Sequence, residues 1–197
     1  MYSIIILVIN MKHPSGIVKN NPKITNYGNR GMGLEGDINL SNEYYLLQDK
    51  AVIHKKPTPI TIQKVDYPSR IEAVIKEAYF KTPSTTDYNG LYKGRYLDFE
   101  AKETKNNSFP LSNIHSHQIE HLRKIVKHGG IAFIIIRFTH LEKTFYLKAD
   151  DLFTFLKTEK RKSIPLSYFE EKGYLIKESF QPRLRYLDIV DTLYFGG

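Results

Sequence analysis

The chain has 197 residues, of which 41% are hydrophobic and 25% charged, a composition that suits one folded domain with a buried core. Lysine and arginine number 29 against 21 aspartate and glutamate, so the formal net charge of +8 favours a polyanionic partner such as nucleic acid. Because cysteine is absent, disulfides, thiolate zinc sites and cysteine nucleophiles are excluded, and we expect a cytoplasmic location.

The N-terminal 32 residues are predicted to be a flexible basic arm. The apolar run at residues 4–9 is far shorter than the roughly 20 residues that span a bilayer, so no membrane association is expected. Residues 1–10 form either a short strand or an extension before a true start at Met11, and we favour the extension. Residues 11–32 are rich in Gly, Asn, Lys and Pro. Arg30 in this arm is a candidate DNA-binding residue.

Residues 33–197 are predicted to form the main domain, beginning with a helix over 33–47. Short strands are expected at 51–54 and 60–65, with Pro57 and Pro59 bending the connection between them. Residues 68–83 are basic and amphipathic, and their apolar side chains fit one helical face. Because this stretch lies between predicted strands, we expect it to project as an arm.

The second half of the domain alternates strands and helices. A hairpin-like segment over residues 86–88 is predicted to turn at Asn89-Gly90, and residues 95–102 alternate as a strand does. A helix over 113–127 ends at a pair of glycines, and the apolar strand 131–136 is expected to pair with 144–147. Asp150 or Asp151 is predicted to cap a short helix that ends at 156, and a last helix covers 186–195. This order predicts a mixed α/β domain.

One strand carries a pattern that suits phosphodiester chemistry. Residues i and i+2 of a strand face the same side, so Glu100 and Lys102 share a face with Asp98. If the strands of the hairpin pair, Asp87 comes to lie beside Glu100. Thr85, two residues before Asp87, would face the same side on an extended strand. Two carboxylates and a lysine would then converge.

Carboxylates are suitable ligands for Mg²⁺, which polarises a phosphate and lowers the pKa of a bound water molecule. Lys102 would stabilise the charge that develops on the phosphate. A simpler interpretation remains open: Asp87 caps the turn at Asn89-Gly90, and Glu100 and Lys102 form a solvated ladder. The nearby aromatic residues Tyr88, Tyr92, Tyr96 and Phe99 either stack on bases or build the sheet, and core packing is favoured for most of them.

A rival pattern lies on the predicted helix 113–127. His117, Glu120 and His121 match H-x-x-E-H, in which two histidines four residues apart can share a zinc ion. The match covers few residues and identifies no third ligand. The alternative is an ordinary polar helix face, on which Glu120 pairs with Lys124.

Several blocks in order resemble the RecU family of bacterial Holliday-junction resolvases. They are NRGMGLE at 29–35, VIHKKPTP at 52–59, STTDYNG at 84–90, DFEAKET at 98–104, FPL at 109–111, HQIEH at 117–121 and LYF at 193–195. The likeness covers roughly residues 12–195, which makes it more specific than an acid-x-Lys tripeptide.

The resemblance implies a PD-(D/E)xK nuclease with a restriction-endonuclease-like mixed sheet flanked by helices. It implies a homodimer that makes paired symmetric nicks in four-way DNA junctions with Mg²⁺, for which Mn²⁺ can substitute. The family pattern identifies Asp87, Glu100 and Lys102 as catalytic. It also identifies Thr85, Asp87, Glu100 and Gln118 as metal ligands. A further acidic residue near the metal corresponds to Glu35.

The resemblance also implies a stalk at about residues 66–83 that enters the junction. Its candidate DNA-binding residues are Arg70, Lys76, Tyr79, Phe80 and Lys81. The family is associated with a RecA-type recombinase and with branch-migration ATPases. Two alternatives stay open at this point: a branched-DNA-binding protein without catalysis, and a zinc metallopeptidase that uses the HQIEH helix.

Overall fold

The computed structural model describes residues 33–69, 73–81 and 85–196. The predicted arm, including Arg30 and the proposed start at Met11, lies outside these residues, as does Arg70. The α-helices in the described part are α1 (Leu34–Leu47), α2 (Ser116–Lys127), α3 (Ala149–Thr158), α4 (Leu166–Lys172) and α5 (Tyr186–Tyr194). The strands are β1 (Val52–Lys55), β2 (Ile60–Asp66), β3 (Val74–Phe80), β4 (Tyr88–Tyr92), β5 (Arg95–Thr104), β6 (Ser108–Pro110), β7 (Ile131–Phe138), β8 (Lys143–Lys148), β9 (Ser163–Pro165) and β10 (Tyr174–Leu175).

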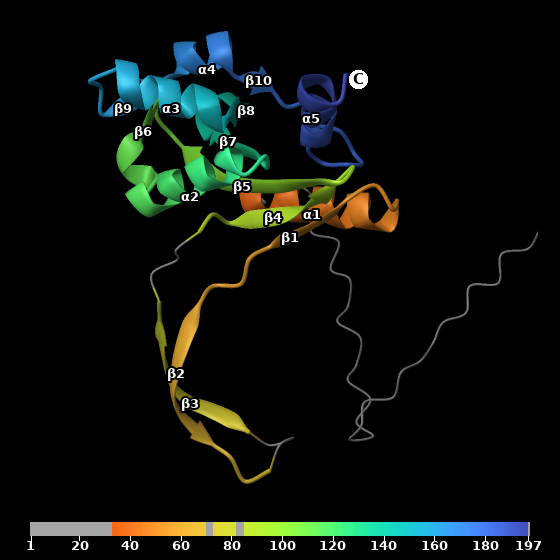
Figure 1. The fold of residues 1–197 in the computed structure, drawn as a ribbon, viewed down its shortest axis with the longest axis vertical. Coiled ribbons are helices and arrows are strands. Elements are labelled where there is room, and N and C mark those ends of the chain that lie inside the picture. The colour runs from red at the N-terminus through yellow and green to blue at the C-terminus, as the bar shows by residue number, and fades with distance from the viewer. Residues whose placement is uncertain (1–32, 70–72, 82–84, 197) are drawn as a thin grey trace, which may run out of the picture. The chain divides into compact units, whose positions relative to one another are not determined.

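The domain is built on a six-stranded mixed sheet in the order β1-β4-β5-β7-β8-β10. The central strands β5 and β7 are parallel, and the other neighbours are antiparallel. Apolar residues of α1 and α5 cover one face of the sheet, whereas those of α2, α3 and α4 pack on the other. Figure 1 shows α1 and the group α2–α4 on opposite sides of the sheet. The predicted mixed α/β fold is confirmed.

Stacked aromatic rings run across four strands on the face covered by α1. Tyr88 on β4 stacks on Phe99 of β5 with ring centroids 4.9 Å apart. Phe99 lies 4.5 Å from Phe133 on β7, and Phe133 lies 4.3 Å from Tyr146 on β8. Core packing was the favoured role for most of the aromatic residues near Asp87, and these contacts confirm it for Tyr88 and Phe99.

Helix α2 forms the crossover between the parallel strands β5 and β7. Such a connection must return along the sheet, so α2 runs antiparallel to both strands. Leu122 of α2 belongs to the cluster that contains Ala132 and Ile134, which neighbour Asp98 and Glu100 in the sheet. The helix therefore covers the face of β5 that carries the even-numbered residues.

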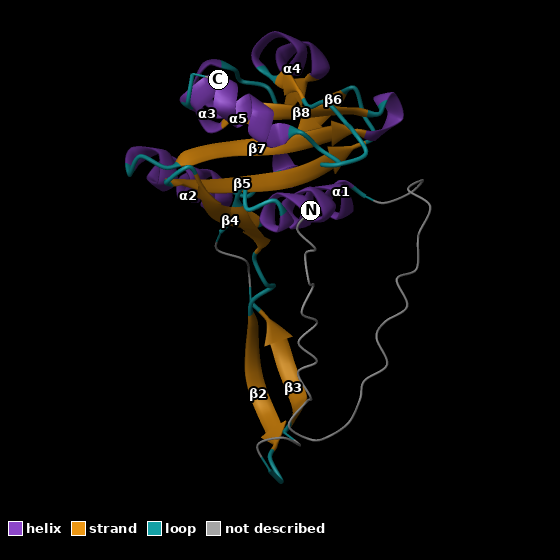
Figure 2. Ribbon diagram, turned by 90° about the vertical axis from the view of Figure 1, so that its right-hand side faces the viewer, coloured by secondary structure: helices purple, strands orange, loops and turns teal. Residues whose placement is uncertain are grey.

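The strands β2 and β3 form a separate two-stranded sheet, drawn as a distinct arm in Figure 2. Every residue of both strands is exposed. The helical face predicted over 68–83 is wrong, because residues 74–80 form a strand instead. Val74 and Ile75 pair with Asp66 and Val65, and β-branched and aromatic residues favour this extended pairing.

The hairpin between β4 and β5 turns at Lys93-Gly94, so the turn predicted at Asn89-Gly90 is wrong. Lys93 and Gly94 have φ values of 47° and 74°, as a tight two-residue turn requires. Gly90 lies inside β4, where a Cβ atom would come within 2.2 Å of the Val52 carbonyl oxygen. The close approach of β1, rather than a turn, explains this glycine.

Helix α3 begins at Ala149 after Lys148, so the predicted cap at Asp150 or Asp151 is also wrong. Both aspartates lie in the first turn, where their charge complements the helix dipole. The extended segment predicted over 86–88 is wrong in its bounds, because β4 begins only at Tyr88. The other predicted helices and strands are confirmed, whereas β6, β9, α4 and β10 were not predicted. None of the helices in the described part of the chain has the length and apolar character that a membrane span needs.

Candidate active site

The pairing of β4 with β5 brings Asp87 to Glu100. Tyr88 pairs with Phe99, so Asp87, one residue before β4, lies opposite Glu100. The Asp87 N–H donates to Glu100 Oε2 at 3.2 Å, and the Ala101 N–H donates to Asp87 Oδ2 at 3.3 Å. The two acidic residues are therefore neighbours, as pairing across the hairpin predicted.

Lys102 completes the group from the same face of β5. Its Nζ lies 2.5 Å from Glu100 Oε1 and 4.0 Å from Asp87 Oδ2. The Glu100 side chain is fully buried, whereas 28% of the Lys102 side chain is exposed. The solvated-ladder interpretation is therefore wrong. The cap proposed for Asp87 fails as well, because Asn89-Gly90 is not a turn.

The environment of Glu100 opposes ionisation. Burial, followed by the charge of Asp87, raises the pKa of Glu100 to about 7, although Lys102 acts in the opposite direction. Burial alone would lower the pKa of Lys102, but its close ion pair with Glu100 raises it. Glu100 Oε1 accepts no hydrogen bond of good geometry, although Lys102 Nζ is near. A buried, incompletely satisfied carboxylate beside a second one suits a divalent cation.

For Thr85 and Gln118, no hydrogen bond to Asp87, Glu100 or Lys102 is seen among the described residues. Thr85 lies in a half-buried bend before β4, so the strand alternation that would direct it towards the site does not apply. Gln118 is 4% exposed in the first turn of α2, and its Oε1 accepts a hydrogen bond from the His115 N–H at 3.0 Å. In this structure the Gln118 amide caps the helix.

The structure adds Thr86, Asp98 and Lys56 to the site, and sequence reasoning identified none of them as functional. The buried Thr86 hydroxyl donates to Asp98 Oδ1, and Lys56 Nζ lies 2.8 Å from Asp98 Oδ2. Strand alternation placed Asp98 on the face of Glu100. The pattern contained no signal that its carboxyl group is fully buried.

The histidines of the HQIEH helix have different surroundings. His121 Nε2 lies 3.1 Å from Asp98 Oδ2, whereas the His117 ring stacks on His115 with centroids 5.3 Å apart. His121 is thus joined to β5, and His117 packs against the residue before the helix. The two imidazoles are engaged separately.

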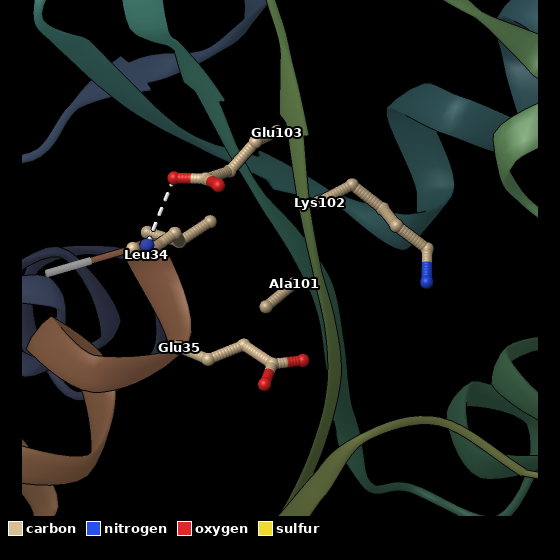
Figure 3. Close-up of a pocket in the computed structure, with 6 residues that line it drawn as sticks. Leu34, Glu35, Ala101, Lys102 and Glu103 are labelled. Atoms are coloured by element: carbon tan, nitrogen blue, oxygen red, sulfur yellow. Dashed lines mark hydrogen bonds between the residues drawn. The ribbon is translucent and has the colours of Figure 1, made fainter.

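A depression of about 320 Å³ lies between the start of α1 and β5, lined by Gly33, Leu34, Glu35, Ala101, Lys102 and Glu103. Figure 3 shows Glu35 and Glu103 on the side of α1, while Lys102 extends to the other side of β5. Glu103 Oε1 accepts a hydrogen bond from the Leu34 N–H at 2.8 Å, and Glu35 forms an ion pair with Lys55. Glu35 acts on Lys102 through charge, since it contributes to the raised pKa of Lys102.

The candidate DNA-binding residues in the described part of the hairpin are exposed. Lys76 forms an ion pair with Asp66 at 3.3 Å, and the Tyr79 hydroxyl donates to Glu77 at 2.5 Å. Phe80 is 82% exposed, and Lys81 is also exposed. These side chains offer charge and ring surface to a partner.

Comparison with known proteins decides the family. The family model described as RecU, Recombination protein U, matches residues 29–192. The Holliday junction resolvase RecU of Geobacillus sp. (strain WCH70) is 56% identical over 175 residues, which cover 87% of this chain and 87% of that protein. The chain belongs to the RecU family.

A second RecU, from Bacillus cereus (strain G9842), is also described as a Holliday junction resolvase. It is 54% identical over 178 residues, which cover 88% of this chain and 89% of that protein. A solved structure of Hjc, a Holliday junction resolvase from Archaeoglobus fulgidus, aligns with a TM-score of 0.43 at 14% identity. That alignment covers 73% of this chain and 95% of the Hjc chain. The resemblance to RecU found in the sequence is confirmed.

Proposed function

We propose that this RecU chain is a crossover-junction endonuclease that resolves four-way DNA junctions by hydrolysing phosphodiester bonds in two strands. The observation that carries the proposal is the buried Glu100 in contact with Asp87 and Lys102, in a chain that shares 54–56% of its residues with Holliday junction resolvases over most of its length. Family membership favours this function over both the non-catalytic DNA-binding protein and the zinc peptidase.

Asp87 and Glu100 would hold Mg²⁺ or Mn²⁺, with Thr85 and Gln118 as neutral oxygen ligands. The bound cation would polarise the scissile phosphate and lower the pKa of a water molecule. Lys102, already beside both carboxylates, would stabilise negative charge on the phosphate. The Ala101 N–H orients the Asp87 carboxylate for this role.

The direction of α2 supports Gln118 as a ligand. His121 contacts Asp98, and Gln118 lies about one turn earlier on the helix. Because α2 runs antiparallel to β5, a step back along α2 corresponds to a step forward along β5, from Asp98 towards Glu100. Gln118 would reach the cation by exchanging its bond to His115 for coordination.

Paired nicks need two active centres, so the proposed resolvase acts as a homodimer. Its proposed location is the cytoplasm. The predicted partners are a RecA-type recombinase and a branch-migration ATPase. Sedimentation of the full chain with a four-way junction tests the homodimer. A junction complex that contains one copy of the chain would contradict it.

Labelled four-way junctions test the function directly. Cleavage should occur with Mg²⁺, stop in EDTA and disappear in Asp87→Ala. Asp191→Asn is the matched control, because this carboxylate pairs with Lys93 at the far end of β4. Junction binding without cleavage at every metal and pH tried would favour the non-catalytic alternative.

A further inference from the structure

Polar groups from several elements contact the carboxyl group of Asp98. Its carboxyl group is fully buried, and Oδ2 lies 2.8 Å from Lys56 Nζ, 3.2 Å from the Tyr96 hydroxyl and 3.1 Å from His121 Nε2. Oδ1 accepts a hydrogen bond from the Thr86 hydroxyl. These groups come from the segment after β1, the segment before β4, β5 itself and α2. One side chain thus links the elements that surround the candidate active site.

The segment that carries Asp87 depends on these contacts. Strand β4 begins only at Tyr88, so Thr86 and Asp87 lie outside its hydrogen-bonded register. The Lys56 N–H donates to the Asp87 carbonyl at 2.7 Å, and Lys56 Nζ donates to the Thr86 hydroxyl at 2.9 Å. Asp98 holds both Lys56 Nζ and Thr86. The cluster around Asp98 therefore helps to set the position of Asp87 over β5, beside the bonds that Asp87 itself makes with Glu100 and Ala101.

The same carboxyl group holds α2. His121 reaches Asp98 from the face of α2 that covers β5, about one helical turn from Gln118. A carboxylate oxygen only accepts hydrogen bonds, so His121 Nε2 carries the hydrogen in this contact. Movement of α2 along β5 would break this hydrogen bond.

We propose that Asp98 is a positioning residue that sets the geometry of the metal site, by fixing the Thr86–Asp87 segment and helix α2 against β5. This inference rests on the proposed metal site. A buried ionic cluster often adds little stability compared with apolar packing, which is consistent with a role in geometry. Groups that orient metal ligands without touching the metal are known to act in this way, and Asp98 would do so through Thr86, the neighbour of Asp87, and through His121 on α2.

Asp98→Asn tests the proposal in the full chain, because it keeps the size of the side chain and removes an acceptor oxygen. Mn²⁺ binding is measured by titration calorimetry, and folding by thermal unfolding in EDTA. We expect Mn²⁺ affinity to fall by about 10- to 100-fold while junction binding in EDTA stays within about 2-fold of wild type. Asp191→Asn, which also loses a hydrogen-bonded carboxylate, should keep its Mn²⁺ affinity. Unchanged Mn²⁺ affinity in a folded Asp98→Asn would overturn the proposal.

A second pair of variants tests the cluster if Asp98→Asn does not fold. Thr86→Ser keeps the hydroxyl that donates to Asp98, whereas Thr86→Val removes it with little change in shape. We expect Mn²⁺ affinity close to wild type in the serine variant and at least about 10-fold weaker in the valine variant. Equal affinities in these two variants would contradict the positioning role.

The wild-type chain separates this inference from the function on which it rests. If wild type neither binds Mn²⁺ nor cleaves junctions, the proposed function fails and the positioning role fails with it. If wild type does both, and Asp98→Asn and Thr86→Val bind Mn²⁺ equally well, only the positioning role fails.

Discussion

The centre of β5 and the β2–β3 hairpin use the same strand pairing in opposite surroundings. On β5, Asp98 and Glu100 are fully buried; side chains from several elements contact Asp98, and the Asp87 N–H and Lys102 contact Glu100. On the hairpin, every strand residue is exposed, and ion pairs such as Lys76–Asp66 stay within the hairpin. Strand neighbours and covering helices fix the geometry of the buried groups, whereas the hairpin surface remains available to a partner.

The largest expected effect is the loss of cleavage in Lys102→Met. This change removes the ammonium group beside Asp87 and Glu100 while keeping most of the side-chain length. Junction cleavage should slow by about 10²- to 10³-fold, the range found when a group that stabilises transition-state charge is removed. Lys143→Met removes an exposed lysine paired with Glu170 and serves as the control. A Lys102→Met rate within a few-fold of the control would rule out the catalytic role.

Gly90→Ala should break the packing of β1 on β4. A new Cβ would lie 2.2 Å from the Val52 carbonyl oxygen and 2.6 Å from Ile53 Cα, so β1 must move. We expect a loss of about 1–3 kcal/mol in the free energy of unfolding, measured by urea denaturation. Gly94→Asn is the control, because nothing lies within 4 Å of a Cβ there and asparagine tolerates positive φ. Equal losses would show that the close approach of β1 has no cost.

Glu100→Gln should stabilise the metal-free protein at high pH. The pKa of Glu100 is raised from 4.5 to about 7, so the folded state keeps this proton while the unfolded state loses it. Stability of the wild type therefore falls as pH rises from about 4.5 to about 7, and the glutamine variant lacks this loss. The free energy of unfolding of the variant minus that of the wild type should therefore be larger at pH 8 than at pH 4, by on the order of 1–3 kcal/mol, as measured by thermal unfolding in EDTA. An equal change of stability with pH in wild type and variant would show that burial does not oppose ionisation of Glu100.

The smallest effect on stability should come from removing the hairpin. The Lys81 N–H donates to the Pro59 carbonyl at 2.9 Å, so residues 60–80 can be replaced by Asn-Gly without moving the ends. The free energy of unfolding should change by less than about 1 kcal/mol, because every side chain of β2 and β3 is exposed. Preference for four-way junctions over duplex DNA should fall, as binding competition would show. An unchanged preference would refute a stalk role for the hairpin.

Strand alternation and helical periodicity predicted much of the fold, including the neighbours Asp87, Glu100 and Lys102. The errors have local causes. Asn89-Gly90 is a favoured turn dipeptide, but Gly90 is needed where β1 pairs closely with β4. Residues 74–80 have apolar spacing that suits a helix, yet their backbone pairs with β2 as a strand. In both cases a contact with another strand overrides the local preference.

The cluster around Asp98 could not be predicted from local patterns. Lys56, Thr86 and His121 are 42, 12 and 23 residues from Asp98 along the chain. They meet only after β1 pairs with β4 and α2 returns over β5. Strand alternation predicted that Thr85 faces the site, but the segment bends before β4 begins, so alternation does not decide where Thr85 points.

The stacked rings of Tyr88, Phe99, Phe133 and Tyr146 lie on the opposite face of the sheet from Asp98 and Glu100. A slip of one residue in β5 would withdraw Phe99 from this stack and turn the acidic residues towards α1. The stack therefore fixes the register of β5 in the sheet. Local opening of other parts of the domain leaves the acidic residues in place as long as the stack stays intact. Backbone amides of β5 should accordingly exchange with solvent only when the whole domain unfolds, while those of the hairpin exchange by local opening.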